Sequence, residues 1–154
     1  MKQRALAALL AAACALAATP AAFAQTTMTG SQQTAYLRHA LANFDRETQM
    51  LATMKNHISS REVIPVAVGG LSVGTPDRRT LARSSRGSRH AALVAALDKA
   101  TVADVDRNNG QSEDQSSLAE YLQHLGIDPN NAVAVDIDPR LDPQNPRVIV
   151  FYRR

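Results

Sequence analysis

A serine flanked by glycines is the first stretch of the sequence that could do chemistry. Residues 70–74 have the pattern G-x-S-x-G around Ser72, directly after an apolar run that is typical of a strand. A nucleophile elbow has this pattern, because the glycines permit a sharp turn that exposes the serine hydroxyl. An aspartate (Asp98, Asp104 or Asp106) and then His124 follow Ser72 in the order that a catalytic triad can take. One hypothesis is therefore a serine hydrolase.

The residues that follow the serine disfavour that hypothesis. An elbow passes from strand to helix at the serine, so Pro76 would fall in the first helical turn and remove a hydrogen bond there. Thr75-Pro76 instead predicts the N-cap and first residue of a later helix. Gly69-Gly70 predicts a tight hairpin turn. We therefore expect Ser72 on a turn or a short return strand, in a protein without catalytic activity.

Two Asp-apolar-Asp sequences supply the candidate metal ligands. Asp104 and Asp106 end one predicted strand, and Asp136 and Asp138 end another. Residues i and i+2 of a strand point to the same face, about 7 Å apart, and Ca²⁺ prefers oxygen ligands of this kind. If the two strands are neighbours, the four carboxylates predict a Ca²⁺ site. The alternative is that they are strand-end residues beside turns, where aspartate is common.

A run of arginines supplies a candidate binding surface. Its members are Arg78, Arg79, Arg83, Arg86 and Arg89. Guanidinium groups pair well with phosphates and carboxylates, so one interpretation is contact with an anionic cell-surface component or an acidic protein. The other interpretation is a solvated face whose arginines pair with the acidic second half of the same chain.

The N-terminus has the pattern of a secretory signal peptide. Lys2 and Arg4 precede an apolar core over residues 5–18, which is too short to span a membrane. Ala22-Phe23-Ala24 is a small-x-small cleavage site. We therefore expect cleavage between Ala24 and Gln25, and a periplasmic or secreted protein.

Lipid anchoring through Cys14 is disfavoured. A lipid-attachment site has a large aliphatic residue three positions before the cysteine, whereas this chain has Ala11. Cys14 also lies in the middle of the apolar core, ahead of a better cleavage site. Because it is the only cysteine, the mature chain is expected to fold without a disulfide.

The composition of residues 25–154 excludes two classes of protein. Loss of Lys2 and Arg4 with the signal leaves 15 basic residues against 14 acidic ones. This nearly equal number of basic and acidic residues argues against nucleic-acid binding. No second apolar run is long enough to predict a transmembrane segment.

Hydrophobic periodicity predicts one long amphipathic helix over residues 32–58. Its apolar stripe contains Leu37, Leu41, Phe44, Leu51, Met54 and Ile58. Further helices are expected at residues 76–83, 89–100 and 117–125. The last of these begins with a Ser117–Glu120 capping box.

Runs rich in β-branched residues predict four strands, at residues 62–68, 101–106, 131–138 and 147–153. Pro65 places the first of them at a sheet edge. The last is apolar on both faces, so we expect it to be covered on both sides. Residues 107–115 are polar and are expected to form a loop.

These elements predict an α+β fold. The long N-terminal amphipathic helix would pack on a small mixed sheet that ends in a C-terminal antiparallel hairpin. The expected organisation is a signal peptide over residues 1–24, a flexible leader over 25–31 and a single domain over 32–154. The expected function is contact with a protein or an anionic surface.

Overall fold

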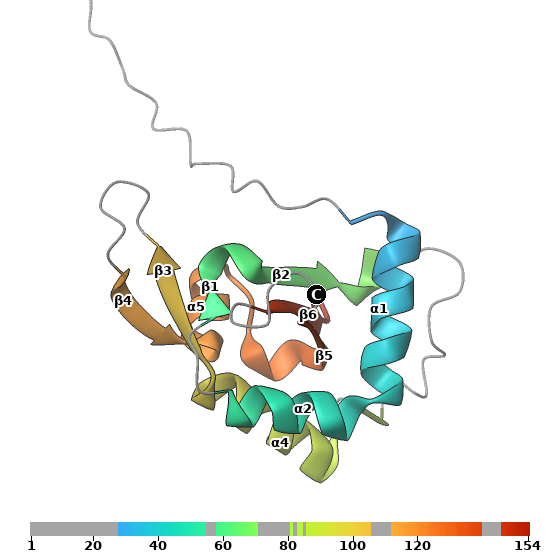
Figure 1. Cartoon of the computed structure of the whole chain (residues 1–154). Helices are drawn as coiled ribbons and strands as arrows, with labels where there is room; N and C mark the ends of the chain where they lie inside the picture. The colour runs from blue at the N-terminus through green and yellow to red at the C-terminus, as the bar shows by residue number, and fades with distance from the viewer. Residues whose placement is uncertain are drawn as a thin grey trace, which may run out of the picture.

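The computed structural model describes residues 28–54, 58–70, 81, 83–84, 86–105, 112–139 and 146–154. Within these ranges the protein has a mixed α/β fold with four α-helices and two small sheets (Figure 1). The central sheet has the strand order β2-β6-β5, and the lateral sheet has the order β1-β3-β4. Both sheets are mixed, because each contains one parallel and one antiparallel pair.

The central sheet contains the C-terminal antiparallel hairpin. Strand β5 (Ala132–Asp138) is antiparallel to β6 (Arg147–Tyr152), which is parallel to β2 (Val63–Ala67) on its other side. Residues 148–151 of β6 are completely buried, as the apolar character of both faces predicted. Pro65 lies on β2, an edge strand, where its missing N–H leaves the sheet intact.

The lateral sheet contains a strand where the sequence predicted a loop. Strand β3 (Thr101–Val105) pairs in parallel with the short β1 (Ile58–Ser59) and antiparallel with β4 (Ser112–Ser117). The polar sequence of β4 has low strand propensity, but pairing with β3 supplies partners for its backbone. The pairing therefore overrides the propensity of the individual residues.

The expected long helix is interrupted. Helix α1 (Gly30–Ala42) and helix α2 (Phe44–Thr53) are separated at Asn43, and Ile58 belongs to β1 rather than to a helix. The Asn43 side chain donates a hydrogen bond to the His39 carbonyl oxygen at 3.0 Å. Such a side-chain bond offers the backbone an alternative to continued helix. As a result α2 runs in a different direction from α1 (Figure 1).

The two remaining helices pack against each other, and one of them also packs against α2. Helix α4 (Gly87–Lys99) packs against α2 and α5 (Leu118–His124). Helix α5 begins with the predicted capping box, in which Glu120 N donates to Ser117 Oγ at 3.1 Å. It ends in a Schellman motif, with Gly126 at positive φ and Ile127 N donating to the Leu122 carbonyl oxygen at 2.9 Å.

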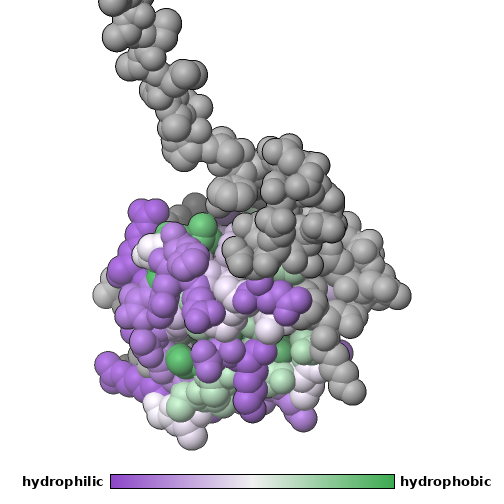
Figure 2. Space-filling view, turned by 90° about the vertical axis from the view of Figure 1, so that its left-hand side faces the viewer, coloured by the Kyte–Doolittle hydropathy of each residue, from purple (hydrophilic) through white to green (hydrophobic). Residues whose placement is uncertain are grey.

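One hydrophobic core joins both sheets and all four helices. Its largest fully buried side chains include Leu37, Leu51, Leu97, Ile149 and Phe151. The face shown in Figure 2 is mainly hydrophilic, with small separate hydrophobic patches. None of the helices in the described part of the chain has the length and apolar content needed to cross a membrane.

Candidate functional site

Asp136 and Asp138 lie on one face of β5, beneath helix α1. Two side chains of α1 reach this face. His39 Nδ1 lies 2.9 Å from Asp136 Oδ1, and the Tyr36 hydroxyl donates a hydrogen bond to Asp138 Oδ2 at 3.1 Å. Both aspartates are buried. The i, i+2 spacing on a strand thus brings both carboxylates to the same helix.

Glu47 enters the same region from α2. Its side chain is buried, with 3% of the residue exposed, and its Oε2 accepts a hydrogen bond from Ile137 N at 3.2 Å. Ile137 lies between the two aspartates on β5, which is an edge strand of the central sheet. The carboxylate therefore satisfies a backbone N–H group on the side of β5 that has no neighbouring strand.

Three potential ligands meet at this point. His39 Nδ1 and one carboxylate oxygen each from Glu47 and Asp136 all lie within 4.8 Å of one another. The His39 side chain is 52% exposed, whereas that of Asp136 is 3% exposed. The cluster therefore has two acidic ligands in the interior and an imidazole at the surface, through which an ion could enter.

Burial controls the protonation of the two carboxyl groups. Desolvation raises the pKa of Glu47, the Ile137 hydrogen bond opposes that shift, and the Asp136 charge adds to it. Desolvation also raises the pKa of Asp136, against the effect of its hydrogen bond with His39. Each carboxyl group thus keeps its proton to a higher pH than an exposed group, because charge is costly to bury.

Three of the four aspartates predicted as metal ligands are described, and they lie on strands of two different sheets. Asp104 belongs to β3 in the lateral sheet, whereas Asp136 and Asp138 belong to β5 in the central sheet. The hydrogen-bonded neighbours of β3 are β1 and β4. Asp106 lies outside the described residues. The condition set for a four-carboxylate site, two neighbouring strands, is therefore not met by β3 and β5, which belong to different sheets.

The proposed serine triad falls mostly outside the described residues. Ser72 and Asp106 are both beyond them, so the hydrolase hypothesis stays a prediction. The third member, His124, is an exposed residue in the last turn of α5.

The arginines divide into groups with different environments. Arg78 and Arg79 lie outside the described residues, whereas Arg83 and Arg86 are exposed. Arg89 forms a two-pronged ion pair with Asp45, with Nε and Nη2 at 2.9 and 3.0 Å from its two carboxylate oxygens. Its guanidinium also lies 4.7 Å from the centre of the Phe44 ring. Arg89 therefore helps to join α4 to α2.

His39 and Glu47 were missed as site residues by the sequence analysis. They are 97 and 90 positions from their partners on β5, so no local motif joins them. The available signal was the i, i+3 pair Tyr36 and His39, which adds polar side chains to the helix beside its apolar stripe.

Comparison of the chain with family models, with curated proteins and with solved structures finds no match.

Proposed function

We propose that this protein is an exported binding domain that holds a divalent cation at His39, Glu47 and Asp136. The observation that carries the proposal is the approach of three ligand atoms to within 4.8 Å of one another. Two of them belong to buried carboxylates. Reading the mature N-terminus by mass spectrometry tests the export, with Gln25 as the expected first residue.

The buried negative charges of the cluster favour binding of a cation. Glu47, Asp136 and Asp138 are three acidic side chains in a buried region, and buried carboxylates are stable when paired with a cation or protonated. A divalent ion between Glu47 and Asp136 would offset the desolvation that raises both pKa values. Asp138, which accepts a hydrogen bond from Tyr36, adds a further negative charge near Asp136.

The ligand set favours a transition ion over Ca²⁺. Calcium takes six to eight oxygen ligands, whereas this cluster offers one imidazole nitrogen and two carboxylates in a small space. Imidazole and carboxylate together suit Zn²⁺, which is commonly four-coordinate and would complete its shell with water here. We therefore choose Zn²⁺ as the probe ion, in place of the Ca²⁺ expected from the aspartates alone.

Thermal and chemical unfolding with added metal tests the proposal. The protein is purified from cells that express the full-length chain, stripped with EDTA and unfolded with and without Zn²⁺. At one hundred times the dissociation constant the ion should add about 2.7 kcal/mol to the free energy of unfolding. Asp136→Asn and His39→Gln should abolish the gain. Asp98→Asn and His124→Gln, at exposed positions, are the matched controls.

An equal response in the cluster variants and the wild type would refute the assignment of these residues. An equal or larger stabilisation by Ca²⁺ would refute the choice of a transition ion.

Contact with an anionic surface remains a second proposed function. It is supported by Arg83 and Arg86, which are exposed side chains at and before the start of α4. Co-sedimentation with phosphatidylglycerol vesicles at low and high salt tests it. The double variant Arg83→Gln/Arg86→Gln should bind less than the wild type at low salt. Absence of salt-sensitive binding by the wild type would remove this proposal.

A further inference from the structure

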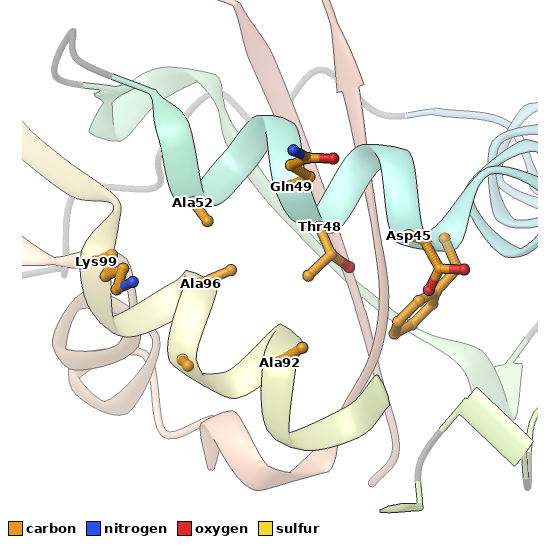
Figure 3. A pocket seen from close by; sticks show the side chains of 9 residues that line it. Asp45, Thr48, Gln49, Ala52, Ala92, Ala96 and Lys99 are labelled. Carbon is orange, nitrogen blue, oxygen red and sulfur yellow. The ribbon is translucent and has the colours of Figure 1, made fainter. Parts of the chain in front are cut away.

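A groove runs along the surface between helices α2 and α4 (Figure 3). Its volume is about 370 Å³. Buried Phe44, Thr48 and Ala96 form its base, while Ala92 and Ala95 line it from the exposed side of α4. The lining of the groove comes from a different face of α2 than Glu47 and includes no residue of the proposed cation site.

Small side chains make the groove accessible to another helix. Ala52 projects from α2, and Ala92, Ala95 and Ala96 project from α4. Alanine has no side-chain entropy to lose on contact. A second helix could therefore approach the two backbones closely without reordering long side chains.

A polar group beneath the groove lacks a partner. Thr48 projects from α2 into the space between the helices (Figure 3), and only 6% of the residue is exposed. Its Oγ1 has no hydrogen-bond partner within the described part of the chain. Because an unsatisfied buried hydroxyl is costly, this position would gain from an incoming polar group after a small side-chain rotation.

The two ends of the groove differ in charge, because one carries the Asp45–Arg89 ion pair and the other carries the Lys99 ammonium. Asp45 lies at one end, held by Arg89 but with 77% of its side chain exposed. Lys99 lies at the other end, next to Ala52, and forms no ion pair with another described residue (Figure 3). The Lys99 ammonium is thus a cation at the groove without a bound counter-charge among the described residues.

We infer that this groove is the interface of a homodimer, occupied by the α2–α4 face of a second copy. A two-fold axis across the groove makes the two copies antiparallel, so that the Asp45 end of one meets the Lys99 end of the other. Each Lys99 then faces Asp45 of the partner subunit, and this contact occurs twice. An exposed carboxylate at one end and an ammonium without an ion pair at the other are self-complementary in this way, which is the requirement of a two-fold interface.

The size of the face implies a transient dimer. Helices of about 15 Å and 20 Å length, each about 10 Å wide, present roughly 350 Å² in each copy. That area is at the low end for specific complexes. We therefore expect monomers at low concentration and reversible dimers at high concentration.

Sedimentation equilibrium over a wide concentration range tests the inference, with EDTA present so that the result does not depend on the cation. The wild type should pass from monomer to dimer as its concentration rises. Ala95→Glu places a charge in the groove and should weaken the dimer at least about tenfold. Ala42→Glu, at an exposed position of α1 outside the groove, is the matched control and should leave the dimer unchanged.

Charge reversal at Lys99 is an independent test of the dimer, because it leaves the alanines of the groove unchanged. Lys99→Glu should weaken the dimer, because its carboxylate would face Asp45 of the partner subunit, and high salt should weaken the wild type in the same direction. A wild type that stays monomeric at the highest concentration would overturn the inference. So would a dimer that tolerates both Ala95→Glu and Lys99→Glu.

Discussion

Helix α2 separates two regions that treat buried polar groups differently. Glu47 points towards β5 and accepts a hydrogen bond from Ile137 N. The adjacent Thr48 points towards α4, where its buried hydroxyl meets no partner among the described residues. One helix therefore has a polar, hydrogen-bonded face on one side and a small-residue face on the other.

The difference shows what each face requires. The inner face of α2 is the one towards β5, and the outer face is the one towards α4. On the inner face, His39 and a backbone N–H group offset part of the free-energy cost of burying Glu47 and Asp136. A bound cation would offset the rest of that cost. On the outer face the alanines leave space, and nothing in the described part of the chain fills it. The inner face is therefore suited to an ion and the outer face to a protein surface.

Loss of the packing of α2 should have the largest effect on stability, because this helix contributes residues to both the cation cluster and the groove. Leu51 is fully buried on this helix, so Leu51→Ala should reduce the free energy of unfolding by about 2–5 kcal/mol. Urea unfolding measures this loss. A loss below about 1 kcal/mol would mean that α2 is not anchored as described.

Glu47→Gln should separate the effect of the Glu47 charge on stability from the effect of its packing and hydrogen bond. Glutamine retains an oxygen that can accept from Ile137 N, but it removes the buried charge. With Zn²⁺ at one hundred times the wild-type dissociation constant, the variant should lack a gain of about 2.7 kcal/mol that the wild type shows. With EDTA at neutral pH, the same variant should be more stable than the wild type. Urea unfolding under both conditions checks this reversal.

A variant that loses stability equally with Zn²⁺ and with EDTA would contradict the cation site, because the carboxylate would then have only a structural role.

Thr48→Val tests whether the buried Thr48 hydroxyl lacks a hydrogen-bond partner. Valine has nearly the shape of threonine without the unpartnered hydroxyl, so the monomer should gain about 1 kcal/mol of stability. Thr34→Val is the matched control, because the Thr34 hydroxyl donates to the Gly30 carbonyl oxygen at 2.9 Å. The control should lose stability, and both changes can be measured by urea unfolding at low protein concentration. A loss at Thr48 equal to that at Thr34 would show that the Thr48 hydroxyl is satisfied.

The smallest effect is a gradual dependence on pH in the metal-free protein. Burial raises the pKa of Glu47 and Asp136 in the folded state, so unfolding releases protons as the pH rises past the ordinary carboxyl range. Their contribution to stability is present at lower pH and is lost as the pH rises through the folded-state pKa values. Relative to the double variant Glu47→Gln/Asp136→Asn, the wild type should therefore become less stable with rising pH. The opposite slope would contradict these pKa directions.

Local chemistry could be predicted from the sequence. The Ser117–Glu120 capping box and the glycine that ends α5 are short-range signals, and both are present. The pairing of Asp136 with Asp138 on one strand face also followed from the alternation of side chains along a strand.

The break at Asn43 and the composition of the site could not be predicted in the same way. The apolar stripe continues past Asn43, so periodicity alone gives one helix. Only the tertiary fold brings His39 and Glu47 from two helices to β5. The partition into two sheets, which separates β3 from β5, likewise depends on long-range pairing.

Crystal diffraction at the zinc absorption edge, from protein crystallised with Zn²⁺, tests the cation site most directly. An anomalous peak is expected about 2.0–2.2 Å from His39 Nδ1 and from carboxylate oxygens of Glu47 and Asp136. The peak should be absent from crystals of Asp136→Asn. A crystal with Zn²⁺ bound at other residues, and with the hydrogen bond between His39 and Asp136 intact, would refute the cation site.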